Sequence, residues 1–393
     1  MFNKTTMSNI ICVLCLALSY EIYFGTVSYY YAVALSLLFA LLTYFASRKN
    51  IIDISPITHI WYLVFPIVVG LLYSCFLFIA HGNGNLAFDK LFSRMLFYSA
   101  TLLQGVCLVI LYGLKAIDLL FDAAVVFYSI RVIEYLVNNG ILSLFNYLYI
   151  SFSGTDMSET SILEAHEVTF VFGLFLIFYI AKGFSRNKYA ILIAFIFILF
   201  GYKRIMIPGL IIAVISFFLV HKVRLKRFIV ALLTMFCYAG SLVWLLLVKN
   251  NDLSNLGSQY NINFMGRVSL NSLISKEYEI VPSYMGKGLG YLDVWSYIHA
   301  VDTDNIALHN DTALMYIELG FFLFAVYFIY YLYLLYSKAK SNMKDIWPGL
   351  FCYTIICWAT DNVQVYFNYQ VVLMSMLFVI VSGIKKENNF TFI

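Results

Sequence analysis

The stretch THIWYLVFPIVVGLLYSCFLFIA, residues 58–80, decides the fold class because it contains no Asp, Glu, Lys or Arg. A helix of about 20 apolar residues covers the roughly 30 Å of hydrocarbon in a bilayer. Similar runs recur along the chain: 62% of its 393 residues are hydrophobic and 12% are charged, whereas soluble domains are about a quarter charged. Backbone amides in hydrocarbon need partners within their own segment, and these runs lack the alternation of barrel strands. The sequence therefore predicts an all-α, polytopic integral membrane protein.

About 12 transmembrane helices are expected, each close to the length that a single crossing needs. The fifth is the least regular, because Asp118, Asp122, Arg131 and Glu134 fall within it or beside it. The predicted spans are residues 9–25, 27–46, 58–80, 94–113, 117–137, 167–181, 189–201, 205–220, 228–248, 312–336, 347–361 and 367–384.

The basic residues give an orientation that agrees with this number of spans. Lys and Arg near span ends favour the cytoplasmic side, and with the N-terminus inside, the inner connections hold most of them, including Arg48 and Lys385. The sequence thus predicts a single membrane domain over residues 1–393 with both termini in the cytoplasm. The first apolar run has no small-residue cleavage site after it, so we expect an uncleaved span. The outer side receives a large loop at residues 249–310, before the tenth span, and a smaller one at residues 138–166.

The large outer loop is where chemistry is expected, because polar residues collect there within an otherwise lipid-like sequence. It ends at His309-Asn310-Asp311, where a partly dehydrated imidazole titrates near neutrality and can act as a general base. A lone histidine at a membrane interface also commonly has a structural role. Glu318 follows inside the next apolar run, where an acid is costly and tends to be paired or functional. Its candidate partners are Arg204, Lys203 and His309.

Two arginines and a glycine cluster each allow two interpretations. Arg204 opens the eighth span at its outer end, where it is either an anchor whose side chain reaches water or a group that binds a lipid phosphate. Arg267 lies in the large loop and is either an ordinary solvated residue or a second anion-binding group. The cluster Gly286-Lys287-Gly288-Leu289-Gly290 either forms turns or lets the backbone approach a ligand closely. It is not a nucleotide phosphate loop, because no GK[ST] signature follows it.

No pattern in the sequence predicts a metal or a cofactor. All seven cysteines lie in apolar runs and none is in an outer loop, so neither a disulfide framework nor a metal site is expected. The net charge of +4 reflects mainly cytoplasmic anchor residues, and it does not suggest nucleic acid as a partner.

Taken together, these features resemble the bacterial O-antigen polymerase and O-antigen ligase superfamily. The twelve-span layout with a large external loop before the tenth span is similar, although the motif is concentrated in residues 266–320 and its glycine spacing is approximate. The matching features, in order, are an outer basic residue at the start of a span, Gly266-Arg267, Pro282 followed by the glycine cluster, His309-Asn310, and Glu318-Leu319-Gly320.

The resemblance implies a metal-independent, inverting glycosyltransferase of the lipid-donor, GT-C-like type in the inner membrane of a bacterium, with its large loops in the periplasm. The implied donor is an oligosaccharide on undecaprenyl diphosphate. Arg204 and Arg267 would bind the diphosphate, and His309 would orient or deprotonate the attacking sugar hydroxyl. Glu318 would mainly hold the geometry of the site. Further substrate contacts are expected from Lys203, Lys287, Asn310 and Glu318.

The resemblance leaves the acceptor open. We favour a polymerase, which joins lipid-linked repeat units in lipopolysaccharide O-antigen biosynthesis, because the chain is very hydrophobic and its loops are modest. A ligase would transfer the glycan to lipid A core instead. A flippase for lipid-linked oligosaccharides is the third candidate, since Asp118 and Asp122 share a helical face, but the sequence has no matching halves. Besides the lipid-linked substrate and the bilayer, a chain-length regulator protein is a candidate partner.

Overall fold

The chain is all helical over the residues that the computed structural model describes, and these residues contain no β-strand. The predicted all-α class is therefore confirmed. The described residues are 4–21, 26–49, 52–81, 85–153, 163, 166–201, 203, 205–253, 255, 259, 267–299, 309–359 and 361–384.

Helices occupy every segment in which the sequence predicts a membrane span. The longer ones are α1 (Lys4–Glu21), α2 (Thr26–Arg48), α3 (Trp61–His81), α4 (Asn85–Tyr112), α5 (Lys115–Ser153), α6 (His166–Gly183), α7 (Lys188–Gly201), α8 (Met206–Lys222), α9 (Lys226–Lys249), α13 (Asp311–Phe328), α15 (Ile346–Trp358) and α16 (Phe367–Ser382). The shorter ones are η2 (Ser55–Ile60), α11 (Arg267–Ile274), η3 (Ser275–Glu277), α12 (Tyr291–Ile298), the π-helix η4 (Ile329–Leu334), α14 (Leu335–Lys338) and η5 (Val363–Val365).

Several of these helices have the length and composition of membrane spans, which supports the membrane class. Five shorter apolar helices accompany them: Thr5–Tyr20, Lys188–Gly201, Met206–Lys222, Ile346–Trp358 and Phe367–Ser382. Twelve crossings, the kind of membrane and the orientation of the termini stay predictions. Among the described residues, the helical stretches long and apolar enough to cross a membrane are Tyr30–Arg48, Ser55–His81, Asn85–Tyr112, Lys226–Lys249 and Asp311–Lys338.

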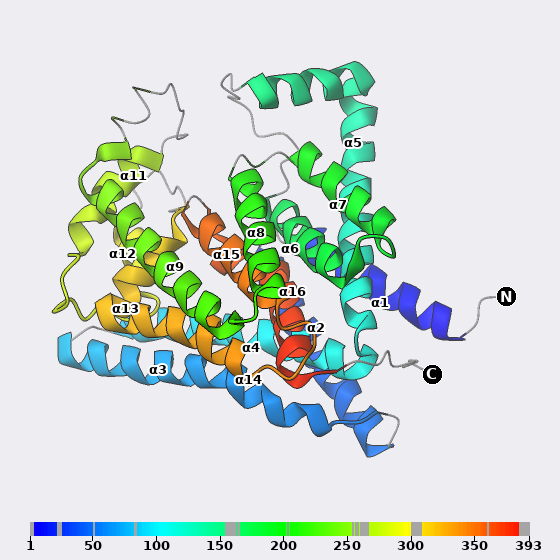
Figure 1. Cartoon of the computed structure of the whole chain (residues 1–393), viewed down its shortest axis with the longest axis horizontal. Helices are drawn as coiled ribbons and strands as arrows, with labels where there is room; N and C mark the ends of the chain where they lie inside the picture. Colours follow the sequence, from blue (N-terminus) through cyan, green and yellow to red (C-terminus); the bar gives the residue numbers. More distant parts are fainter. Residues whose placement is uncertain are drawn as a thin grey trace.

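The helices α15 and α16 lie at the centre of the fold (Figure 1). Nearly every residue of α15 and α16 is buried, as is usual for helices without a polar face. α16 contacts α4 and α6, and α15 contacts α8. α3 and α9 instead keep large apolar side chains such as Phe76 and Phe236 exposed. Such surfaces are suited to contact with lipid.

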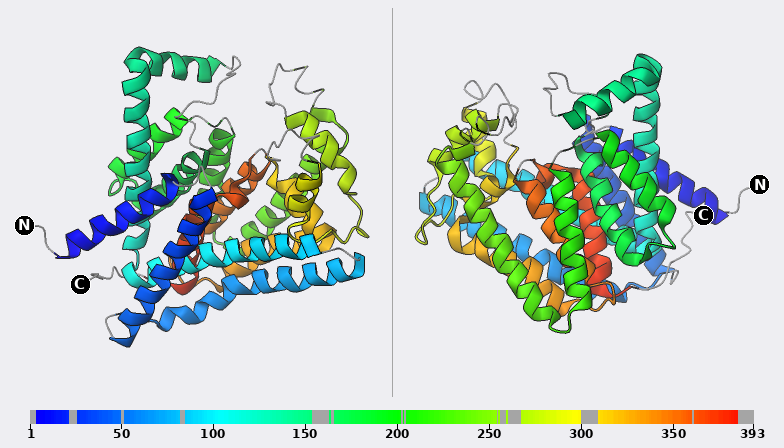
Figure 2. Two further views of the ribbon diagram at one scale, coloured as in Figure 1. Left: turned by 180° about the vertical axis from the view of Figure 1, so that it is seen from behind. Right: turned by 45° about the horizontal axis from the view of Figure 1, so that its top comes forward.

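α5 continues past the predicted end of the fifth span at residue 137 and reaches Ser153. It therefore enters the segment expected as an outer loop, residues 138–166. At Gly140 the backbone leaves helical geometry (φ 77°, ψ 167°), a conformation open mainly to glycine. The two parts of α5 consequently point in different directions, as the left view of Figure 2 shows.

Candidate functional site

The candidate site forms where α13 is broken by Gly320, whose backbone (φ 74°, ψ 176°) is not helical. A break inside a membrane helix leaves carbonyl and amide groups without their usual helical partners, and these must be satisfied by other parts of the protein. The segment 284–290 supplies those partners. The backbone N–H groups of Lys287 and Gly288 donate to the carbonyls of Ile317 and Glu318, both at 2.9 Å. In return, Phe321 N–H donates to the carbonyl of Tyr284 at 2.8 Å.

The glycine cluster makes this close approach between backbones feasible. Gly286, Gly288 and Gly290 all have positive φ, at 86°, 90° and 85°. A Cβ atom on Gly286 would lie 2.5 Å from Gly320 N, and one on Gly290 would lie 3.0 Å from Leu91 N on α4. The glycines therefore bring segment 284–290 against α4 and α13. Of the two interpretations offered by the sequence, close backbone approach is the one observed, and the backbone approached is the protein's own.

A buried charged group lies directly beside the break. Glu318 is fully buried, and its Oε1 accepts hydrogen bonds from Gly290 N at 2.9 Å and Leu292 N at 3.4 Å. Arg94 on α4 is 5% exposed, and its Nη2 donates to Asp293 Oδ2 at 2.8 Å. Arg94 also interacts electrostatically with Glu318.

The sequence analysis did not select Arg94 as a candidate site residue. Arg204, Lys203 and His309 were the candidate partners of Glu318; Arg204 lies outside the described residues, and among those described it is Arg94 that interacts electrostatically with Glu318. The signal for Arg94 was present, because an arginine at the edge of an apolar run is expensive and usually functional or paired.

His309 and Asp361 form a second polar pair of the site. His309 lies two residues before the start of α13 and has a positive φ of 44°, and its Nδ1 lies 3.5 Å from Asp361 Oδ1. Asp361 is 1% exposed and accepts hydrogen bonds from Tyr366 Oη at 2.6 Å and Asn362 N at 2.8 Å. Lys203 interacts electrostatically with it. The carboxylate of Asp361 is therefore held in place beside the imidazole of His309, 3.5 Å from Nδ1, while Nδ1 itself has no hydrogen-bond partner among the described residues.

Asn310 and Asp311 fasten the start of α13 to its surroundings. Asn310 Oδ1 accepts from Ala313 N at 3.0 Å and so caps the helix, while Asn310 Nδ2 donates to Asn271 Oδ1 at 3.0 Å. Asp311 Oδ2 accepts from Gln364 N at 2.7 Å, and Asp311 N donates to the carbonyl of Asp361 at 3.4 Å. Asp311 therefore lies between the His309–Asp361 pair and the Arg94–Glu318 group.

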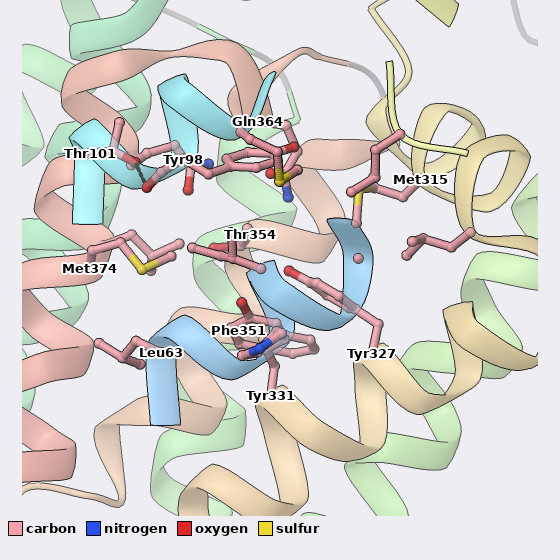
Figure 3. A pocket seen from close by; sticks show the side chains of 18 of the residues that line it. Leu63, Tyr98, Thr101, Met315, Tyr327, Tyr331, Phe351, Thr354, Gln364 and Met374 are labelled. Carbon is pink, nitrogen blue, oxygen red and sulfur yellow. Dashed lines mark hydrogen bonds between the residues drawn. The ribbon is translucent and has the colours of Figure 1, made fainter. Parts of the chain in front are cut away.

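A mostly apolar cavity adjoins these polar residues (Figure 3). Its volume is about 100 Å³, and it is lined by side chains from α3, α4, α13, α15 and α16. Its wall includes Tyr98, Leu319 and Gln364. Tyr98 interacts with Arg94, Leu319 follows Glu318 in the sequence, and Gln364 N donates to Asp311. Leu63, Phe351 and Met374 are part of its apolar side. The arrangement fits a ligand with one polar and one apolar end.

Lys287, predicted to contact substrate, pairs with a carboxylate of the same protein. Its Nζ lies 2.5 Å from Glu277 Oε2 and 3.1 Å from Tyr291 Oη. Burial alone would lower the pKa of Lys287, but these two partners raise it above its usual value. Burial likewise would raise the pKa of Glu277, yet hydrogen bonds from Lys287, Tyr291 and Trp295 hold that pKa below its ordinary value.

Replacing Glu277 by glutamine is expected to lower thermal stability near neutral pH and to have little effect in acid. Because the folded-state pKa of Glu277 lies below its ordinary value of 4.5, the stabilisation is present above that pH and is lost as the pH falls through the lowered pKa. Melting temperatures of the purified wild type and variant should differ by a few degrees near pH 7. A difference that persisted unchanged in acid would contradict this assignment.

The structure describes the two remaining predicted site residues in part or not at all. Arg204 lies outside the described residues, and of Arg267 only the backbone, at the start of α11, is described. Within the described residues, no three His, Cys, Asp or Glu side chains gather so as to hold a metal ion. On α5, Asp118 accepts a hydrogen bond from Tyr179 and pairs with Lys182, both on α6, and Arg131 pairs with Glu134.

No family model matches this sequence, and neither a curated protein nor a solved structure is significantly similar to the chain.

Proposed function

We propose that this protein is an O-antigen polymerase of a bacterial inner membrane, which joins oligosaccharide units carried on undecaprenyl diphosphate by inverting glycosyl transfer. The observation that carries the proposal is the His309–Asp361 pair, which adjoins a buried polar group and an apolar cavity within a helical membrane protein. A lipid-linked sugar has the same division into a polar head and an apolar chain. The sequence resemblance to the polymerase and ligase superfamily supports the same activity.

The proposed reaction is a displacement at the anomeric carbon of the donor sugar. A hydroxyl of the acceptor sugar forms the new C–O bond, and its proton passes to Nε2 of His309, whose Nδ1 faces Asp361. The bond between the anomeric carbon and the diphosphate oxygen breaks, and undecaprenyl diphosphate leaves. Arg204 and Arg267 would neutralise the charge that develops on the leaving group, in a metal-independent manner.

Two features suit a lipid-linked donor. The apolar cavity would hold the first part of the polyprenyl chain, because side chains such as Leu63, Phe351 and Met374 offer it no polar partner. The broken helix α13 places non-helical backbone inside an apolar segment. Membrane proteins tolerate such backbone where protein covers it or where it lines a cavity.

Deleting the gene is expected to give lipopolysaccharide whose core carries a single repeat unit, with the ladder on a gel restored by the wild-type protein. A polymerase joins units that other enzymes make and attach, so its loss removes the long chains and leaves the first unit in place. Core with no repeat unit would contradict the polymerase assignment. In that case, the side of the membrane on which the lipid-linked glycan accumulates would separate a ligase from a flippase.

A further inference from the structure

We infer that Arg94, Tyr98, Asp311 and Glu318 form a subsite for sugar hydroxyls, which grips the part of the glycan nearest the lipid. This inference rests on the proposed function, because it assigns a part of the same lipid-linked substrate to these four residues. We call them the hydroxyl subsite. None of the four matches a group that the reaction described above requires.

The main observation is that three buried polar atoms in this group have no hydrogen-bond partner among the described residues. They are Arg94 Nη1, Asp311 Oδ1 and Glu318 Oε2. Each belongs to a side chain that is at least nine-tenths buried, with exposures of 5%, 0% and 0%. A buried polar atom left unpaired costs about 1–3 kcal/mol, and more when the group is charged. Three in one place indicate a location that a polar ligand completes.

The three side chains act on one another and on Tyr98, so they form one group. Arg94 interacts electrostatically with Tyr98 and Glu318, and Asp311 interacts with Arg94 and Glu318. Tyr98 follows Arg94 by one helical turn on α4 and therefore lies on the same face. It also lines the cavity, close to Gln364 and Thr101 in Figure 3. The group is thus placed at the polar edge of the cavity.

The charges of the group decide which chemistry it would bind. Asp293, Asp311 and Glu318 bring three carboxyl groups against the single guanidinium of Arg94. Unpaired carboxyl oxygens are also poor partners for the oxygens of a diphosphate, which only accept hydrogen bonds. A sugar hydroxyl both donates and accepts. Hydroxyls would donate to Glu318 Oε2 and Asp311 Oδ1, and accept from Arg94 Nη1.

The position of Asp311 connects this subsite to the reacting groups. Its backbone N–H donates to the carbonyl of Asp361, the partner of His309. A glycan held by the hydroxyl subsite would therefore have its reducing-end sugar close to His309. The subsite would thus help to select the first sugar of the repeat unit.

Lipid binding to the purified full-length protein in nanodiscs tests the subsite. The probes are sugar-free undecaprenyl diphosphate and the lipid-linked glycan extracted from cells that lack this protein. Glu318→Gln keeps an oxygen for Gly290 N and Leu292 N but removes the charge, and Tyr98→Phe removes one hydroxyl. We expect Glu318→Gln to weaken binding of the glycan-bearing lipid roughly 10- to 100-fold, as for a lost hydrogen bond to a charged group, and Tyr98→Phe to weaken it roughly 3- to 10-fold, as for a lost hydrogen bond between neutral groups. Binding of undecaprenyl diphosphate should change less than about two-fold.

A matched control is Tyr336→Phe, which removes a buried tyrosine hydroxyl far along the span, where it donates to Asp345 at 3.0 Å. It should leave the affinity for both lipids unchanged. The subsite is overturned if both variants bind the two lipids as the wild type does, or if they lose both lipids equally. A wild-type protein that binds neither lipid would instead remove the proposed function, and a wild type that binds both equally would remove only the subsite.

Discussion

Replacing His309 by alanine is expected to abolish growth of the glycan chain while leaving the protein in the membrane at its normal level. The imidazole is the group placed to take the proton of the attacking hydroxyl, and general base catalysis contributes about 10²–10⁴-fold to a rate. Its side chain is 25% exposed and lies at the edge of the packed interior, so its loss should not unfold the protein. The lipopolysaccharide ladder measures chain growth, and an immunoblot of membranes measures the amount of protein.

His221 provides the control for this experiment, because it is a second histidine beside an aspartate. Its Nδ1 lies 3.2 Å from Asp345 Oδ2 at the end of α8, remote from the broken helix. His221→Ala should therefore leave the ladder intact. A normal ladder from His309→Ala would exclude His309 from the chemistry.

Replacing Gly320 by alanine is expected to prevent correct folding, with a loss of roughly 3 kcal/mol or more of stability. The backbone of Gly320 has a φ of 74° and a ψ of 176°, which is essentially restricted to glycine. A Cβ atom there would also overlap the Met285 carbonyl and lie 2.5 Å from Gly286 N. These atoms belong to the backbone and cannot move aside as a flexible side chain could. The amount of monodisperse protein after detergent extraction, and its melting temperature, measure the effect.

Gly240→Ala is the matched control for that prediction. Gly240 lies within α9, and a Cβ atom there would meet nothing within 4 Å. Alanine should be neutral or stabilise the protein by about 0.5–1 kcal/mol, because glycine is the poorer residue within a helix. Similar yields from the two alanine variants would show that the backbone of residue 320 is helical and that the described break in α13 is wrong.

The positions of the helices could be predicted from the sequence because the apolar runs have nearly the length of a bilayer crossing. The break in α13 could not, although Gly320 belonged to the motif that suggested the resemblance. A glycine within an apolar run is compatible with a continuous helix, and the break depends on pairing with segment 284–290, about 30 residues earlier in the chain. Such pairing is a long-range contact that local patterns do not encode.

Only part of the candidate site could be predicted, because its partner residues also come together through long-range contacts. His309 and Glu318 could be selected from the sequence, because each is a polar residue next to or inside an apolar run. Their partners were not identified. Asp361 was the last residue of a predicted span, and Arg94 was the first residue of another, so both were interpreted as boundaries. The fold brings both against α13, and no spacing rule connects residues so far apart.

The central claim is that this chain by itself lengthens a lipid-linked glycan, and reconstitution tests it most directly. Purified wild-type protein in lipid vesicles would be supplied with the lipid-linked repeat unit extracted from cells that lack it, in the presence of a chelator. We expect products two and more repeat units long, with released undecaprenyl diphosphate, and none from His309→Ala. Unchanged substrate with the wild type, or elongation that is equally fast with His309→Ala, would contradict it.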